Sequence, residues 1–516
     1  MTLRVHRVPA SVVLCLLAIL ATSVAAPPHA HAATTWVYPT ACNGATTLQM
    51  CIDNAADGDT VQVATDGPIA ESLSITKSLD LEAAKGNHPR VSGGVQILST
   101  ASPVQVQVQG LRFGDTVVAQ LSVGGSVVLD HVRVHPVDGA GISLSAGEGA
   151  DFTVRSSTVT GFSGKAAGIV ALSYQTMGLG TVTLVGNQLR AKGVADSASG
   201  IEIDAQQTNT ELVQVANNVI WHSGTCLCGD SAAVAVSAIG SGTTQVDVVG
   251  TTVDRSRSGG LHVNNKLASG HLTVHAFNNV FAHLGRSAIS VDATNPATQT
   301  LRFGDNDTWE AGEHSTFGGA GPGRGNLHAD PLFVDERHGR LALRARSPLV
   351  DAGLVCSPAG VADPDAAGRN RLAGRTVDLG AYERGATPPT GLAWSGSTGP
   401  SSVLIGTAGD DILCGGGRTD KLEGGGGRDY IDGGPGRDFI YGLAGSDRLF
   451  GGPGPDTVIG GPGGDRIFGG GGSDICLYSR DGGHGNDRVD GGPGRDHYRA
   501  DRGDTVQNAE ARGCVH

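Results

Sequence analysis

Short runs in which apolar and polar residues alternate extend from residue 36 to residue 385. Two of the clearest are Gly58–Val63 and Glu71–Leu81. Alternation with a period of two is typical of strands that bury one face and expose the other. Related strand patterns return roughly every two to three dozen residues along this region. This spacing predicts successive coils of a repetitive β fold.

Two series of strands keep step within this region. In the first series a small polar residue stands two positions before an apolar one: Asp130/Val132, Ser157/Val159, Asn187/Leu189, Asn218/Ile220, Thr251/Val253 and Asn278/Val280. In the second series two inward residues flank an outward one: Ile142/Leu144, Ile169/Ala171, Ile201/Ile203, Val234/Val236, Leu261/Val263 and Ile289/Val291. A right-handed parallel β-helix produces such series, because each coil buries its strands against the next. We expect the polar members of the first series to form an inward ladder at a bend.

A second and much stricter pattern occupies the C-terminal region. From Gly406 to Leu477 a nine-residue unit of the form GGxGxDxUx, where U is apolar, recurs eight times without a gap. Two further copies begin at Gly482 and Gly491, after a four-residue insertion. The glycines allow positive φ and sharp turns. The apolar residue at position eight is expected to point inward from a short strand: Leu413, Leu422, Ile431, Ile440, Leu449, Val458 and Ile467.

The aspartate at position six defines the candidate chemistry of these units. If two units make one coil, turns on the same side stack every eighteen residues. One stack then holds Asp411, Asp429, Asp447 and Asp465, the other holds Asp420, Asp438, Asp456 and Asp474, and Asp487 and Asp496 extend them. Like charges at strand spacing repel unless a cation lies between them. Ca²⁺ suits this gap because it takes six to eight oxygen ligands, so we expect several Ca²⁺ ions and folding coupled to metal binding.

These ten units resemble the RTX, or haemolysin-type, calcium-binding repeat family, and the resemblance implies a calcium-loaded parallel β-roll. The chain departs from the pattern at four positions. Thr407 and Leu443 replace the second glycine, Arg418 replaces the third, and Cys476 takes an apolar position. Sites that use those turns are expected to be weaker. A disordered glycine-rich linker would have a similar composition, but the strict phase of aspartate and apolar residues argues against it.

The end of the N-terminal region carries a second signature. It contains Asp330–Phe333 and Ser347–Gly353, then Asp363, Gly368 and Arg369, and finally Asp378–Glu383. These motifs resemble the C-terminal part of the pectin-lyase-like "choice-of-anchor Q" bacterial surface proteins, which implies a secreted β-helix. We interpret the stretch as the cap that closes the helix, with aspartates bonded to backbone groups in turns. Residues 386–402, rich in Pro, Gly, Ser and Thr, are expected to be a linker.

Composition and the N-terminal segment bear on the location of the protein. The chain has 516 residues, 81 of them glycine, and a formal net charge of −13, which argues against nucleic acid as a partner. Residues 1–32 resemble a secretory signal, with an apolar run and an Ala30-His31-Ala32 cleavage site. No later segment is apolar enough to span a membrane. We therefore expect a secreted, extracellular protein.

The cysteines fit an oxidising compartment. Eight remain after cleavage, an even number. Cys42 and Cys51 could close the N-terminal cap, and Cys476 and Cys514 could tie the tail to the last coil. Cys226-Leu227-Cys228 stands alone, so a structural disulfide is favoured there over a zinc site.

Enzymatic activity is the competing interpretation of the β-helix. A β-helix joined to RTX repeats also resembles secreted mannuronan C5-epimerases, but their D-P-H motif is absent. One constellation could act on sugars. Glu202 and Asp204 share a strand face, and His262 is expected two coils away, so the three could bind hydroxyl groups or serve as acid and base. An ordinary solvated strand face is the alternative.

The sequence thus predicts an all-β protein in four parts: a signal peptide (1–32), a right-handed parallel β-helix (33–385), a linker (386–402) and a calcium-binding β-roll (403–516). The predicted function is extracellular calcium binding, with the β-helix serving interaction with carbohydrate or a cell surface. The alternative is a polysaccharide lyase or uronan epimerase that acts on acidic glycans.

Overall fold

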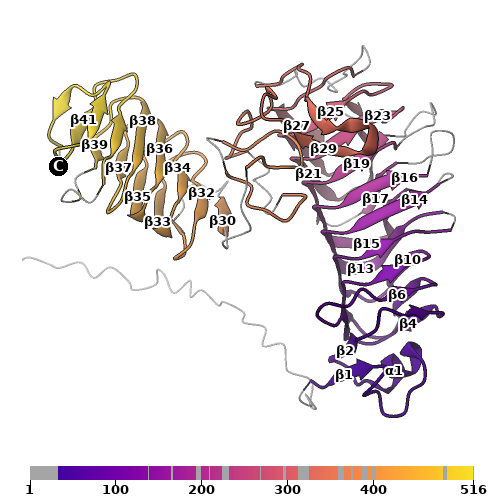
Figure 1. Cartoon of the computed structure of the whole chain (residues 1–516). Helices are drawn as coiled ribbons and strands as arrows, with labels where there is room; N and C mark the ends of the chain where they lie inside the picture. Colours follow the sequence, from indigo (N-terminus) through magenta and orange to yellow (C-terminus); the bar gives the residue numbers. More distant parts are fainter. Residues whose placement is uncertain are drawn as a thin grey trace, which may run out of the picture.

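The structure is a computed structural model of the whole chain. It describes residues 33–514, except for 138, 164–166, 193–198, 208–209, 224–231, 268, 294–297, 312–324, 358–364, 374–375, 386–392, 397–402, 480 and 482–484. The expected signal peptide, Asp363 and the pair Cys226 and Cys228 lie outside the described residues. Figure 1 shows a tall stack of coils from the N-terminal region and a second, smaller stack that leaves it near the upper end.

The larger stack is a parallel β-helix whose coils contribute strands to three faces. The first face comprises β4 (Leu73–Ile75), β7 (Val95–Ser99), β10 (Val117–Leu121), β13 (Ile142–Arg155), β15 (Ile169–Val185), β17 (Ile201–Gln207), β20 (Ala232–Gly240), β23 (Gly259–Leu267) and β26 (Ile289–Ala293). The second face comprises β1 (Thr35–Tyr38), β2 (Asp59–Val63), β5 (Leu79–Ala83), β8 (Val104–Gln109), β11 (Gly125–Asp130), the second halves of β13 and β15, β18 (Thr210–Ala216), β21 (Thr243–Val249), β24 (His271–Phe277) and β27 (Gln299–Gly304).

The third face is narrower, and its nine short strands form one parallel sheet. It comprises β3 (Pro68–Ile69), β6 (Arg90–Val91), β9 (Arg112–Phe113), β12 (Arg133–Val134), β14 (Thr158–Phe162), β16 (Gln188–Ala191), β19 (Val219–Trp221), β22 (Thr252–Asp254) and β25 (Val280–Ala282). Inward residues of all three faces form one continuous aliphatic core. This arrangement explains the alternation along the chain, because every second residue of a strand enters that core.

The second strand series is confirmed at every position. Ile142, Ile169, Ile201, Val234, Leu261 and Ile289 are paired in register on consecutive coils of the first face. Their partners two residues later, from Leu144 to Val291, are paired in the same way and are buried. The spacing of the apolar pairs therefore predicted both the strands and their register.

The polar ladder of the first series is confirmed in its middle and wrong at both ends. Ser157 N donates to Asn187 Oδ1 at 3.0 Å, and Asn187 N donates to Asn218 Oδ1 at 3.0 Å. Farther along, the ladder uses Asn279, whose Oδ1 accepts from Thr251 N, so Phe281 is the inward residue there and Val280 is not. At the other end Val134 pairs with Val159, so Asp130 lies outside the ladder. The turn before the third face has two residues in each of these coils, so turn length did not cause the errors. The ladder position is occupied by the apolar Val132 at one end, and by Asn279, which directly follows Asn278, at the other.

Small structures close the two ends of the β-helix. At the N-terminal end the helix α1 (Leu48–Asn54) is capped by Thr47, and the predicted disulfide Cys42–Cys51 is confirmed. At the C-terminal end β28 (Phe333–Asp335), the 3₁₀ helix η2 (Glu336–His338) and β29 (Arg340–Leu343) cover the third face. There they bury an apolar cluster that includes Trp221, Leu349 and Leu379. Among the described residues, none of the helices is long and apolar enough to cross a membrane.

The smaller stack is a parallel β-roll of two seven-stranded sheets. One sheet contains β30 (Ala393–Gly396), β32 (Asp411–Cys414), β34 (Tyr430–Asp432), β36 (Arg448–Pro453), β38 (Arg466–Gly471), β40 (Arg488–Asp490) and β42 (Thr505–Gln507). The other contains β31 (Val403–Ile405), β33 (Lys421–Gly427), β35 (Phe439–Gly445), β37 (Thr457–Ile459), β39 (Cys476–Tyr478), β41 (His497–Arg499) and β43 (Ala511–Arg512). β30 lies inside the stretch that composition predicts to be a linker.

The roll core is one residue wide, as the position-eight pattern predicts. Leu413, Leu422, Ile431, Ile440, Leu449, Val458 and Ile467 are all 0–1% exposed and form one cluster. The prediction for the eighth unit was wrong by one residue, because Leu477 pairs with Val458 and occupies the core position. Ile475 is the extra residue, so part of the insertion precedes this strand. Cys476 points instead to the predicted disulfide with Cys514, which is confirmed.

A third disulfide, Cys356–Cys414, joins the two stacks. Beside it Val355 and Val377 of the β-helix closure pack against Ile412 and Tyr430 of the roll. This pairing, between cysteines 58 residues apart, was not predicted from the sequence. A disulfide and an apolar contact therefore attach the roll to the end of the β-helix.

Candidate functional site

The position-six aspartates form two columns that run along the roll. In one column Asp411 N donates to Asp429 Oδ1, and the same bond links Asp429 to Asp447, Asp447 to Asp465 and Asp465 to Asp487, at 2.8–2.9 Å. In the other column the bonds join Asp420, Asp438, Asp456, Asp474 and Asp496, at 2.8–3.0 Å. All ten of these aspartates are at most 2% exposed. Both stacks therefore form as the eighteen-residue spacing predicts.

In eight of these aspartates one carboxylate oxygen is used by the ladder, and the second accepts no hydrogen bond. Eight of the aspartates have a buried Oδ2 atom without a hydrogen-bond partner: Asp429, Asp438, Asp447, Asp456, Asp465, Asp474, Asp487 and Asp496. A buried carboxylate oxygen without a donor is costly and is found where a metal ion or another partner binds. The structure thus presents two lines of acidic oxygens that require a positive partner.

Glycine at position one of the described units keeps these oxygens accessible to a shared partner. A Cβ atom on Gly442 would lie 2.5 Å from Asp447 Oδ2 and 2.6 Å from the carbonyl oxygen of Gly460. The same is true of Gly424, where it would meet Asp429 Oδ2 at 2.3 Å and Gly442 O at 2.7 Å. Carboxylate and carbonyl oxygens from neighbouring coils therefore converge on a space that any side chain would fill. An all-oxygen donor set of this kind fits Ca²⁺.

Burial raises the pKa of eight of these ten carboxyl groups above the ordinary aspartate value. It raises the pKa of Asp429, Asp438, Asp465 and Asp474 to about 7, and that of Asp447, Asp456 and Asp487 to about 6. Neighbouring aspartates of the same column raise the pKa of Asp465 further, while the backbone donor partly offsets the rise. Simultaneous ionisation of neighbouring aspartates in a column is therefore unfavourable unless a cation is bound between them.

This gives a pH dependence that calcium should abolish. Between about pH 4 and pH 7 the folded roll binds more protons than the unfolded chain, because the folded pKa values of about 6 to 7 exceed the unfolded one. The stability of the calcium-free roll is therefore highest at acidic pH and is lost as the pH rises through 7. We expect the circular dichroism signal of the roll to increase when calcium-free protein is brought from pH 8 to pH 5. A calcium-free roll that is more stable at pH 8 would contradict this assignment.

The columns continue beyond the residues that the sequence analysis named. Asp487 N donates to Asp504 Oδ1 at 3.1 Å, and Asp496 N donates to Glu510 Oε2 at 3.0 Å. The run Gly503-Asp504-Thr505-Val506 repeats the second half of a unit and could have revealed the first of these. Glu510 is fourteen residues from Asp496 and follows no repeat. At the other end, Thr407 Oγ1 donates to Asp411 at 3.1 Å, so this departure from glycine occupies part of the first turn.

Two other departures retain the glycine-like conformation at the cost of backbone strain. Leu443 has a φ of 71°, and Arg418 has a φ of 83°. Side chains other than Gly, Asn and Asp seldom adopt this left-handed region, and each such residue costs on the order of 1 kcal/mol. These turns keep the shape of the repeat although the residue has changed.

The candidate residues on the β-helix lie where the strand register predicts. Glu202 pairs with Ala235, which pairs with His262 on the next coil, and Asp204 shares the face of Glu202. Burial, and then the charge of Asp204, raises the pKa of Glu202. The His262 side chain is only 7% exposed, and its Nδ1 lies 2.8 Å from Ser290 Oγ. The imidazole is therefore engaged within the sheet and is not a solvated group of an open groove.

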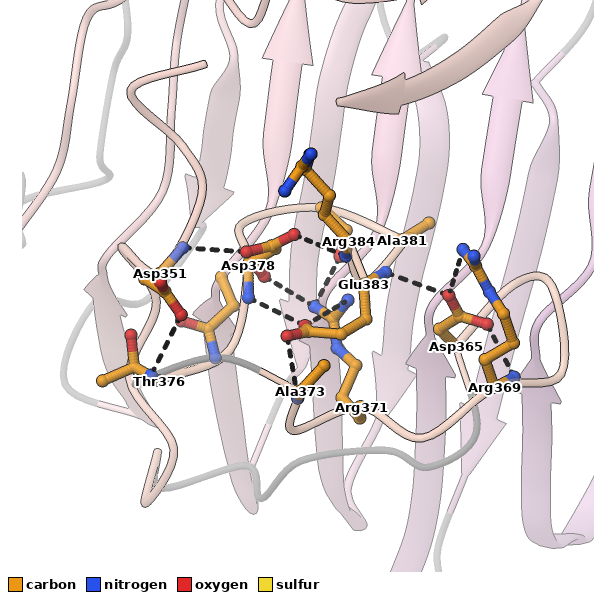
Figure 2. A network of polar contacts seen from close by, with 12 residues as sticks. Asp351, Asp365, Arg369, Arg371, Ala373, Thr376, Asp378, Ala381, Glu383 and Arg384 are labelled. Carbon is orange, nitrogen blue, oxygen red and sulfur yellow. Dashed lines mark hydrogen bonds and ion pairs between the residues drawn. The ribbon is translucent and has the colours of Figure 1, made fainter. Parts of the chain in front are cut away.

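The acidic residues of the closing cap accept hydrogen bonds from backbone N–H groups in turns, as predicted (Figure 2). Asp365 accepts from the backbone of Ala367, Arg369 and Glu383. Asp378 accepts from Asp351 N and Arg384 N. These carboxylates replace backbone acceptors in turns, which explains the abundance of aspartate in this part of the chain.

A buried arginine organises the same network. Arg371 is 1% exposed and donates to the carbonyl oxygens of Asp378 and Gly380. Its Nη1 atom lies 3.9 Å from Glu383 Oε2, and burial raises the pKa of Glu383 to about 8. Arg371 lies outside the sequence motifs of this region, so its role was not predicted.

Comparison with known families agrees with the geometry of the roll. Residues 405–440, 415–449, 441–476 and 481–506 match the model of the RTX calcium-binding nonapeptide repeat, in four copies. The C-terminal part of the chain therefore consists of RTX calcium-binding repeats. No curated protein is similar to the chain at a significant level.

Comparison with solved structures concerns the β-helix. The chain is similar to pectate lyase Pel9A, with 14% identity and a TM-score of 0.36 over 68% of this chain and 96% of that chain. It is also similar to the PL6 family alginate lyase AlyGC, with 11% identity and a TM-score of 0.26 over 90% of this chain and 80% of that chain. Nothing about the activity of this chain follows from either likeness.

Proposed function

We propose that the protein binds several Ca²⁺ ions between adjacent turns of the roll. The ligands are the ten position-six aspartates, from Asp411 to Asp496, together with turn carbonyl oxygens. The observation that carries this proposal is the set of buried Oδ2 atoms without a hydrogen-bond partner. Each bound ion would neutralise carboxylates of consecutive coils, so that calcium completes the fold of the roll.

Replacement of one central aspartate tests the assignment. In Asp447→Asn the amide oxygen can still accept from Asp429 N, but the amide NH₂ group replaces the oxygen that faces the proposed ion. We expect equilibrium dialysis to show at least one fewer Ca²⁺ per chain. Asp490→Asn is the matched control, because Asp490 bonds to Gln507 and Asn508 and lies outside both columns. Equal calcium content in the Asp447→Asn variant and the wild type would exclude this column as the binding site.

We further propose that the protein is secreted and that its β-helix contacts extracellular carbohydrate or a cell surface. The three disulfides of the described residues support an oxidising location. The net charge of −13 favours partners other than nucleic acid.

A polysaccharide lyase or uronan epimerase is the second candidate, and the in-register placement of Glu202, Asp204 and His262 favours it. The test incubates the calcium-loaded protein with uronate and neutral polysaccharides. Absorbance of unsaturated ends, reducing ends and the proton NMR spectrum of the polymer are then measured. If this face is catalytic, Glu202→Gln lowers turnover by at least about a hundredfold. Retention of the polymer without product would indicate that the β-helix binds carbohydrate but is not an enzyme. If the polymer is neither retained nor converted, carbohydrate is excluded as the partner of the β-helix.

A further inference from the structure

Three side chains of metal-binding type meet on the third face of the β-helix, beneath its C-terminal closure. Asp254 ends β22, His283 follows β25 one coil later, and Glu336 opens η2. His283 Nδ1 lies 2.8 Å from Asp254 Oδ1 and 3.6 Å from Glu336 Oε1. Among the described residues, this is the one group of three such side chains whose ligand atoms all lie within 4.8 Å of one another.

The carboxylate and guanidinium groups around His283 carry more negative than positive charge, which favours binding of a divalent cation. The Asp254 side chain is fully buried, and its Oδ2 atom accepts no hydrogen bond. A third carboxylate, Glu310, lies 3.6 Å from His283 Nε2. Arg255 contacts both Asp254 and Glu336 and supplies one positive charge against these three negative ones.

One member of the cluster, His283, lines a hollow of about 500 Å³. The hollow is lined by His222, Arg255, Ser256, Arg257, His283 and Glu310, among others. A metal ion held by the buried Asp254 and by His283 would therefore keep one side open to water or to an anionic ligand. Reactive zinc sites have this arrangement of three protein ligands and one open position.

We infer that Asp254, His283 and Glu336 form a binding site for a divalent transition-metal ion of the Zn²⁺ type. The imidazole nitrogen distinguishes this site from the columns of the roll, because Ca²⁺ takes oxygen ligands whereas Zn²⁺ accepts nitrogen and carboxylate oxygen together. The three ligands come from segments up to 82 residues apart and meet only because β22 and β25 are adjacent and η2 covers them.

Calorimetric titration of the full, disulfide-bonded chain with Zn²⁺ tests the site, with millimolar Ca²⁺ present to saturate the roll. We expect one Zn²⁺ per chain that Ca²⁺ does not displace. His283→Gln and Glu336→Gln should each weaken binding by at least about tenfold. His275→Gln is the matched control, because His275 Nδ1 also lies 2.9 Å from a buried aspartate, Asp247, yet belongs to no group of three among the described residues.

A variant with increased affinity for Zn²⁺ would show that the losses in the other variants are not due to misfolding. Arg255 donates to Glu336, so its guanidinium competes with the ion for this ligand. Arg255→Gln should therefore tighten Zn²⁺ binding by about twofold to fivefold. The inference is overturned if the calcium-saturated chain binds no Zn²⁺, or if His283→Gln and Glu336→Gln bind it as the wild type does.

Discussion

Removal of calcium is expected to unfold the roll and leave the β-helix intact. The roll core is a single line of aliphatic residues, nine in its buried cluster, and it lies beside two columns of buried carboxylates. Without a cation the repulsion and burial of these groups oppose folding, and so thin a core does little to offset them. The β-helix has a continuous core on three faces and does not depend on the roll ligands. Chelation should therefore abolish the far-ultraviolet signal of the roll alone.

Limited proteolysis locates this transition in the chain. We expect cleavage within residues 403–516 to accelerate by at least about a hundredfold in a calcium chelator, as when sites saturated at a hundred times Kd are emptied. The Cys356–Cys414 disulfide should retain a roll fragment on the β-helix until a reductant is added. Mg²⁺ serves as the control and should not protect, because it demands a small octahedral site. Equal cleavage of both parts, or none, would show that calcium does not govern the roll.

Replacement of the buried arginine in the cap should be the most damaging single substitution in the β-helix. Arg371→Met removes the donors of two carbonyl oxygens and leaves Glu383 without its cation. Loss of one partner from a buried ion pair typically costs about 3–5 kcal/mol. The loss should be greater at pH 9 than at pH 7, because the pKa of Glu383, already raised to about 8, leaves the carboxyl largely protonated at the lower pH.

Guanidinium denaturation followed by tryptophan fluorescence measures this effect, since Trp221 lies in the apolar cluster of the closure. Arg369→Met is the matched control. Arg369 is 36% exposed and pairs with Asp365, which retains its backbone donors, so we expect a loss of about 1 kcal/mol or less. If the two variants are equally stable, Arg371 does not organise the cap.

The predictability of this fold follows from its repetition. Apolar residues at fixed spacing identified the strands from Ile142 to Val291 and the roll core from Leu413 to Ile467, because each coil repeats the contacts of the one before it. The errors fall where neighbouring residues are of the same type, or where a residue is inserted. Asn279 replaces Asn278 in the ladder, and Ile475 displaces Cys476 from the roll core. A shift of one residue reverses the face of a strand, so local pattern alone cannot correct such an error.

The candidate calcium ligands could be named from the sequence for the same reason. Each aspartate of the two columns occupies the same position of its unit, so its neighbours in space are its neighbours in the repeat. The exceptions are Asp504 and Glu510, which end the columns after the strict repeat has stopped. That eight of the carboxylates have one oxygen in the ladder and one without a hydrogen bond became visible only in three dimensions, because the backbone donor comes from the preceding coil.

The sequence by itself therefore determined the two repetitive stacks, their inward residues and the columns of aspartates. A period is a property of the chain, and stacking converts it directly into contacts. Only the tertiary structure decided the joining of the stacks by Cys356 and Cys414, the burial of Arg371, and the meeting of Asp254, His283 and Glu336. These contacts connect loops that do not repeat and are far apart along the chain. Which residues meet depends on the conformation of each loop, and the spacing of residues in the sequence does not predict that conformation.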